Sequence, residues 1–425
     1  MDKIKLSEEF VEFQLLREDD IPKQILEKGT VKVDTIDETG YHRMDVSQPW
    51  RGLLKENIEK YLQRLENGLK ETDPNNYSVY TGSSGIALLY YHLSSTTFCQ
   101  NTSEQQQLLS KALDVLESNL DKVKGKRLTF LCGDAGVYAL SAVLYSKHGD
   151  MKKCEKCVEK LCAMCESVVS DPSLPDEILY GRAGFLYSLL FIQTHLGKEK
   201  VSDAIIEQVV TAILKSGLSL SRKERSRSAL MYVWHDKHYV GAAHGIVGIL
   251  YMLLQVYPSS PVVTQHITEI QNTIDYLLTK QFSSGNFPSS LENESDRLIH
   301  WCHGAPGAVF LMLKAYQVFE ERRYLDVAIS CGNVVWKRGL LRKGYGICHG
   351  VSGNAYTFLA LYKQTGDQVD LHRAFKFAEW TFSYGEHNCR TPDTPYSLFE
   401  GLAGTIYFWS DLFEPQKSRF PAFEM

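Results

Sequence analysis

Apolar residues follow two alternating patterns along this chain. In the first pattern, apolar residues recur at spacings of three and four, and charged residues lie on the opposite face of the predicted helix. Examples of these amphipathic stretches are Glu104 to Leu120, Val263 to Leu278, Tyr324 to Trp336 and Leu371 to Phe382. Seven other segments are apolar on nearly every face, which is typical of buried helices: Ile86 to Leu93, Val137 to Tyr145, Phe185 to Phe191, Ile249 to Leu254, Ala308 to Leu313, Ala355 to Tyr362 and Thr405 to Trp409. Signals for strands are sparse. The pattern therefore predicts an all-α protein in which inner and outer helices alternate.

A G-x-x-G tetrad stands before each of the seven apolar segments. The tetrads begin at Gly82, Gly133, Gly181, Gly245, Gly304, Gly350 and Gly401, at successive intervals of 51, 48, 64, 59, 46 and 51 residues. Such a repeat indicates supersecondary units that bury a common core by stacking on one another. The glycines at both ends of each tetrad are expected to allow positive φ and a close backbone approach at a helix start.

Seven helix pairs could form an open solenoid or close into a ring. Neither end has an obvious polar capping helix and the inner helices are apolar all round, which favours an α/α toroid of seven inner and seven outer helices. We expect residues 51–425 to form this toroid and residues 1–50, which show no repeat, to be a leader packed on its outside. The inner helices would then point their free N–H groups at one pole of the ring, where anions and thiolates are favoured.

Composition excludes some classes of protein. The formal net charge is -5 and Lys and Arg are dispersed, so there is no basic face for nucleic acid. The N-terminus has no apolar signal region, and no stretch of 18 or more apolar residues occurs. We therefore expect a cytoplasmic protein whose ten cysteines are mostly reduced, with at most peripheral contact with the plasma membrane.

Two Cys-His pairs occupy the same position in the repeat. Cys302-His303 precedes Gly304, and Cys348-His349 precedes Gly350. Equivalent positions of a ring face one centre, so these side chains are expected to meet. Two thiolates and an imidazole suit Zn²⁺. If His303 also binds, the site is closed and structural; if it does not, Cys302, Cys348 and His349 leave a position open for a substrate.

An open site would have a definite chemical use. Zinc deprotonates a thiol that binds to it and so delivers a nucleophilic thiolate at neutral pH. His244, directly before Gly245, holds the same repeat position and is a candidate acid or base at the same pole. The alternative for His244 is a histidine hydrogen-bonded at a helix start.

A second group of cysteines is not predicted to bind metal. Cys154, Cys157, Cys162 and Cys165 follow the pattern C-x2-C-x4-C-x2-C. The central gap is much shorter than in zinc ribbons, and all four thiols fall along one helical stripe. We interpret them as small buried core residues.

At its tetrads the chain resembles the LanC-like family, the eukaryotic relatives of bacterial lanthionine synthetase cyclases. The resemblance spans all seven repeats and is most specific at three segments: Tyr239 to Gly245, His300 to Gly307 and Gly344 to Gly350. Two further segments, Leu128 to Gly136 and Phe420 to Glu424, look closest to animal members. The resemblance implies an α/α toroid with one zinc ion bound by Cys302, Cys348 and His349, and it implies that His303 is not a ligand.

The resemblance also implies an activity. Family members similar to this chain bind glutathione and transfer it to electrophiles, including dehydroalanine and dehydrobutyrine in proteins. His244 matches the active-site histidine of the family, so His244 and the zinc ligand Cys348 are the predicted catalytic residues. Lys343 and Arg390 match basic positions associated with glutathione, whose carboxylates need cationic or N–H partners.

The chain departs from the bacterial cyclases at two positions. Those enzymes usually carry an arginine four residues before the first zinc cysteine and a tyrosine directly after it, where this chain has Leu298 and His303. This argues against lanthionine ring formation. The bacterial catalytic aspartate falls near Asp176 and Glu177, in a register ambiguous by one residue, and either carboxylate could instead cap the following helix.

Two other functions compete with a zinc-dependent glutathione transferase. One is a scaffold that binds glutathione and zinc and docks signalling proteins; Pro392 to Pro395 has P-x-x-P spacing for an SH3 domain, although so short a match is more often a rigid loop. The other is a carboxylate-dependent glycosidase, as in other α/α toroids. It is the least favoured, because the repeat singles out Cys and His rather than paired acids.

Overall fold

The computed structural model describes residues 31–36, 42–46 and 48–425. Most of the predicted leader, residues 1–50, lies outside these ranges, so its packing on the toroid stays a prediction. The described part begins with an antiparallel hairpin of β1 (Val31–Ile36) and β2 (His42–Val46), followed by helix α2 (Gln48–Gly68). Helix α2 thus starts just before the predicted domain boundary. From α2 onward the described chain is helical, as the apolar pattern predicts.

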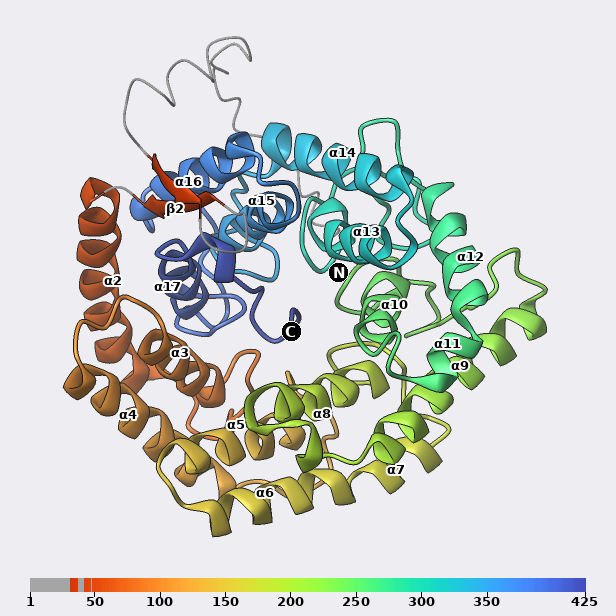
Figure 1. Ribbon diagram of the computed structural model, residues 1–425, viewed down its shortest axis with the longest axis horizontal. Helices are drawn as coiled ribbons and strands as arrows, with labels where there is room; N and C mark the ends of the chain where they lie inside the picture. The colour runs from red at the N-terminus through yellow and green to blue at the C-terminus, as the bar shows by residue number, and fades with distance from the viewer. Residues whose placement is uncertain (1–30, 37–41, 47) are drawn as a thin grey trace, which may run out of the picture.

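Seven inner helices form a closed ring (Figure 1). They are α3 (Ser83–Ser95), α5 (Asp134–Lys147), α8 (Arg182–Leu196), α10 (Ile246–Gln255), α13 (Ala305–Phe319), α15 (Val351–Thr365) and α17 (Leu402–Asp411). The first glycine of each tetrad is the N-cap of its inner helix. Each inner helix contacts the next, and α17 contacts α3. The predicted α/α toroid is therefore confirmed.

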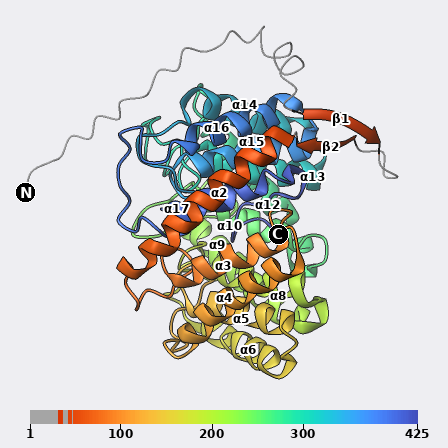
Figure 2. The same cartoon turned by 90° about the vertical axis from the view of Figure 1, so that its left-hand side faces the viewer.

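The outer helices surround this ring (Figures 1 and 2). They are α2, α4 (Thr102–Leu120), α6 (Met151–Ala163) with α7 (Cys165–Ser170), α9 (Asp203–Glu224), α11 (Pro261–Gln265) with α12 (Ile267–Leu278), α14 (Arg322–Arg338) and α16 (Gln368–Phe382). Short 3-10 helices lie at Leu69–Glu71, Lys198–Lys200 and Pro415–Lys417. Helix α2 packs on α17, so the first outer helix belongs to the last inner helix and the two ends of the chain close the ring together.

The tetrad glycines are required for space rather than for backbone conformation. A Cβ on the second glycine of any tetrad would lie 1.8 to 2.3 Å from the carbonyl oxygen six residues earlier, far closer than real Cβ contacts. Positive φ, by contrast, occurs among the tetrad glycines only at Gly304, with φ 117°. The expectation that the tetrads use positive φ was therefore wrong elsewhere. Instead, the first turn of each inner helix packs so closely against the loop before it that a Cβ atom has no space.

The loops before the inner helices are hydrogen-bonded to one another around the pole. Cys302 N donates to Cys348 O at 3.2 Å, and Cys348 N donates to Phe399 O at 2.8 Å. Phe399 N then donates to Tyr80 O at 3.0 Å, which joins the last repeat to the first. These hydrogen bonds between loops hold the residues that directly precede the tetrads in a fixed arrangement.

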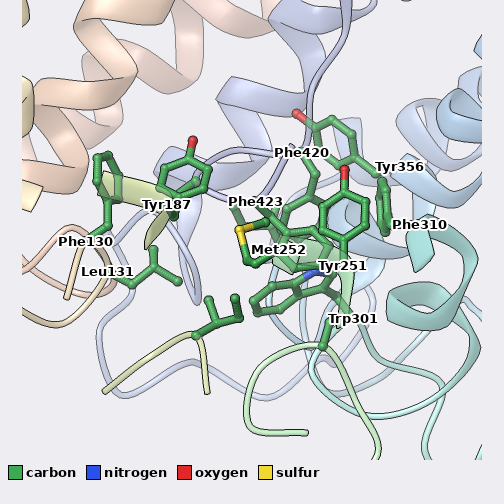
Figure 3. Packing of buried hydrophobic residues seen from close by; sticks show 14 of the residues in the cluster. Phe130, Leu131, Tyr187, Tyr251, Met252, Trp301, Phe310, Tyr356, Phe420 and Phe423 are labelled. Atoms are coloured by element: carbon green, nitrogen blue, oxygen red, sulfur yellow. The ribbon is translucent and has the colours of Figure 1, made fainter. Parts of the chain in front are cut away.

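Aromatic side chains and the C-terminal segment fill the centre of the ring (Figure 3). Phe420 stacks on Trp301 with ring centroids 4.9 Å apart, and Phe423 stacks on Tyr251 at 4.5 Å. The Lys363 ammonium lies 2.8 Å from the Glu424 carboxylate and ties this segment to α15. Because Trp301 directly precedes Cys302, the C-terminal segment supports the loop that carries this cysteine.

Helix α9 is long and apolar enough to cross a membrane by length and composition alone, whereas the sequence analysis expected no such stretch. In the fold it is an outer helix that packs on α8 and α7. Val209 and Ile213 are among its buried side chains. The cytoplasmic location stays a prediction.

Candidate active site

Three side chains that could hold a metal ion meet at the pole where the inner helices begin. The Cys302 and Cys348 sulfur atoms and one His349 ring nitrogen lie within 4.8 Å of one another. We call these residues the Cys2His cluster. Both cysteines are buried, and the hydrogen bond from Cys302 N to Cys348 O holds their loops together. Two sulfur donors and one nitrogen donor at this separation fit a tetrahedral Zn²⁺ with one position left for a further ligand.

His303 is not part of the Cys2His cluster. Its ring lies beside those of Tyr239 and His244, with centroids 5.7 and 6.5 Å away. Burial lowers the pKa of His303 to about 4, so the imidazole is neutral at pH 7. Of the two alternatives left by the sequence, this arrangement favours the site with three ligands.

His244 forms a pair with Glu177. The Nδ1 atom of His244 lies 2.7 Å from Glu177 Oε2, and the Glu177 side chain is only 2% exposed. The Glu177 carboxylate also accepts hydrogen bonds from the backbone N–H groups of Leu179 and Tyr180. With the carboxylate as acceptor, His244 carries its proton on Nδ1, and Nε2 is left to accept or donate a proton.

Asp176, which directly precedes Glu177, has different partners. Asp176 forms an ion pair with Arg182 at 2.9 Å and accepts a hydrogen bond from Ser216 Oγ. Neither Asp176 nor Glu177 is the N-cap of α8, which is Gly181. The structure therefore assigns Glu177, not Asp176, to the side chains around His244.

The two predicted glutathione cations lie on adjacent segments. Arg390 N donates to Arg342 O at 2.8 Å, which places Arg390 beside the residue before Lys343. Burial and, after it, the charge of the exposed Lys343 lower the pKa of His300, close to the Cys2His cluster. The Arg390 side chain is 64% exposed and lies 3.4 Å from Asp393. Lys343 is thus near the cluster, whereas Arg390 is at the rim.

The four cysteines that we excluded as a zinc site are free thiols on α6 and α7. Cys154, Cys157 and Cys165 are buried and Cys162 is half-buried. Among the residues that the structure describes, the Cys2His cluster is the one group of three or more side chains arranged to hold a metal. The burial of Cys154, Cys157 and Cys165 agrees with their interpretation as core residues, whereas Cys162 lies at the edge of the core.

Sequence reasoning missed Tyr80. Its hydroxyl donates to the Cys348 sulfur at 2.9 Å, and its ring stacks on Phe399 at 4.9 Å. Tyr80 lies two residues before Gly82, the same repeat position that Cys302 and Cys348 occupy before their own tetrads. The repeat position of Tyr80 could therefore have identified it as part of the site. It was missed because only Cys and His were considered as metal ligands.

Replacing Tyr80 with phenylalanine is expected to weaken zinc binding by about 10-fold or more, because hydrogen-bond partners of metal ligands typically contribute 10- to 100-fold to affinity. Competition with a chromophoric chelator would measure this. Tyr77→Phe is the matched control, since it removes a hydroxyl that bonds to Asp134 rather than to the cluster. Equal zinc affinities in the two variants would show that the contact with Cys348 does not tune the metal site.

Comparison with known proteins identifies the family of this chain. A family profile described as "Lanthionine synthetase C-like protein" matches residues 73–425. The chain belongs to the lanthionine synthetase C-like family. It is 45% identical to "Glutathione S-transferase LANCL1" of Danio rerio over 90% of this chain and 93% of that protein. It is 35% identical to "LanC-like protein GCL1" of Arabidopsis thaliana over 83% of this chain and 82% of the relative.

A solved structure of nisin cyclase shares the fold of this LanC-like protein. The TM-score is 0.66, with 17% sequence identity, and the match covers 84% of this chain and 93% of nisin cyclase. At this identity the likeness concerns the fold. It agrees with the closed toroid that the seven tetrads predict.

Proposed function

We propose that this protein is a zinc-dependent glutathione transferase that adds the glutathione thiol to electrophilic carbon atoms, including those of dehydroalanine and dehydrobutyrine in proteins. The observation that carries the proposal is the Cys2His cluster, which supplies three of the four ligands of a tetrahedral metal ion, at the same pole as the His244–Glu177 pair. The Danio rerio relative, named a glutathione S-transferase, supports glutathione as the thiol.

The residues around the cluster have separable roles in this proposal. Zinc, when bound, would stabilise the glutathione sulfur as a thiolate. His244 Nε2 would accept the proton of the incoming thiol, because Glu177 holds Nδ1 as a donor. As the sulfur bonds to the β-carbon of a dehydroamino acid, the electrons of the carbon–carbon double bond form an enolate. His244 would return the proton to the α-carbon, so that the net reaction is addition across the double bond.

Glutathione carries two carboxylates that need partners. Lys343 lies close to the cluster and Arg390 at its rim, so the two cations would hold the tripeptide with its thiol directed inward.

The scaffold alternative gains no specific support from the loop around Pro395. The Pro395 carbonyl accepts a hydrogen bond from Leu402 N at 2.9 Å, and Thr394 Oγ1 donates to Glu400 at 2.9 Å. Both prolines of the P-x-x-P segment are half-buried. The segment thus has the contacts of a loop fixed to the start of α17, and docking to an SH3 domain stays a prediction.

The proposed activity is tested by incubating a dehydroalanine peptide with glutathione and detecting the adduct by mass spectrometry. We expect wild-type protein to form the thioether faster than buffer does, and Cys348→Ala to match buffer because a metal ligand and its charge are lost. Cys162→Ala, which removes a half-buried thiol outside the cluster, should retain the wild-type rate. A wild-type rate equal to that of buffer would contradict the transferase, and glutathione binding without turnover would then favour the scaffold.

A further inference from the structure

A cavity of about 850 Å³ lies beside the Cys2His cluster. Residues that precede the first three tetrads line it, including Tyr80, Cys132 and Tyr180. Lys126 and Arg127, from the loop before the second tetrad, also belong to its lining. The cavity therefore combines a wall of tetrad-loop side chains with a pair of adjacent cations.

The tetrad-loop wall touches both parts of the proposed chemistry. The Tyr80 hydroxyl lies 2.9 Å from the Cys348 sulfur. The Tyr180 ring is stacked parallel to that of His244, with centroids 6.1 Å apart and an angle of 9° between the planes. A molecule in this cavity would therefore lie next to side chains that contact the metal site and the proton-transferring histidine. Lys343 and Arg390 do not line the cavity, so it does not overlap the cations proposed for glutathione.

The charge of the cavity lining is positive. Lys126 and Arg127 are both exposed, and their side chains form no ion pair with any residue that the structure describes. The one carboxylate in the lining is Asp73, which accepts a hydrogen bond from Asn75 N. The carboxylate of Asp134, which is not part of the lining, accepts hydrogen bonds from Lys126 N and from the Tyr77 hydroxyl. Two adjacent cations that form no ion pair with the described residues, in a chain of net charge -5, indicate an anionic ligand.

We propose that this cavity binds the electrophilic substrate and that its preferred substrate is an acidic peptide segment, with carboxylates beside the dehydroamino acid. The inference rests on the proposed function, because it assigns the second substrate of that reaction. Lys126 and Arg127 would hold the flanking carboxylates while the double bond lies against the tetrad-loop wall. They act on specificity and touch neither the metal cluster nor His244.

Two dehydroalanine peptides that differ only by flanking Asp or Asn residues provide the test. We expect wild-type protein to use the acidic peptide with a kcat/KM about 3- to 10-fold higher at low salt, and the preference to shrink as salt screens the charges. The double variant Lys126→Glu/Arg127→Glu should lose or reverse the preference while its KM for glutathione stays unchanged. Lys124→Glu, an exposed charge reversal in the same loop but outside the cavity lining, is the control for position.

Three results would overturn the inference: equal use of both peptides by wild-type protein, an equal effect of Lys124→Glu, or a higher KM for glutathione with unchanged peptide preference. The last would mean that the cations hold glutathione. A binding measurement separates this inference from the proposed reaction. Fluorescence anisotropy with unreactive alanine peptides should show tighter binding of the acidic peptide, and loss of that difference in the double variant, even if no turnover occurs.

Discussion

Replacing His244 with glutamine is expected to lower kcat for glutathione addition by about 10²- to 10⁴-fold, the usual contribution of a general acid–base residue. Glutamine keeps a polar side chain of similar length, but it cannot accept the thiol proton and return it to the α-carbon. Zinc content should remain at the wild-type level, because His244 is outside the Cys2His cluster. Steady-state kinetics together with metal analysis would separate these two effects.

The matched control for this variant is His238→Gln. His238 is also hydrogen-bonded to glutamates, Glu224 and Glu292, but it lies outside the cluster of side chains around His244. Its replacement should leave kcat close to wild type. A His244→Gln protein that kept both its zinc and its activity would show that another group carries the proton, and the neutral His303 would be the next candidate.

The second large effect is expected for Gly353→Ala, which should destabilise the fold by about 3 kcal/mol or more through overpacking. The new Cβ would lie 1.8 Å from the Ile347 carbonyl oxygen and 2.6 Å from the Ile347 carbonyl carbon. Both atoms belong to the backbone, so the loop itself must move rather than a flexible side chain. Because Ile347 is bonded to Cys348, zinc affinity should fall as well. Urea unfolding and zinc titration would measure the two losses.

Gly52→Ala provides the comparison for this prediction. Gly52 lies in α2, and a Cβ added there would have no atom within 4 Å, so alanine should be neutral or stabilising by up to about 1 kcal/mol. Unfolding of Gly353→Ala at the same urea concentration as Gly52→Ala would show that the tetrad glycines are not required for space. The same test can be repeated at the second glycine of each of the other tetrads, where the approach is almost as close.

The repeat made a large part of the site predictable from sequence. Each tetrad marks the start of an inner helix, and a closed ring brings equivalent positions to one pole. The repeat therefore predicts that Cys302, Cys348 and His349 lie close together, although 46 residues separate the two tetrads that they precede. Local rules sufficed because the spacing of apolar residues determines which segments are buried helices, and the tetrad determines where each begins.

Other features of the site and the fold arise only because the ring of helices is closed. Helix α2 lies before the first tetrad, and the repeat did not show which inner helix it contacts; in the structure it packs on α17. The hydrogen bond from Tyr80 to Cys348 spans 268 residues and joins the first repeat to the sixth, so it exists only because the ring closes. Sequence periodicity is a local property and carries no information about which distant partner completes the circle.

The sequence by itself thus determined the seven-fold helical repeat and the helix starts, and it predicted that Cys302, Cys348, His349 and His303 come together as candidate metal ligands. Only the tertiary structure decided between Glu177 and Asp176, turned His303 toward His244, and placed a cationic cavity beside the cluster. The physical reason is that adjacent residues in a tight loop point in different directions. Their side chains settle on whichever partners the neighbouring repeats supply, and those partners are fixed by packing across the ring.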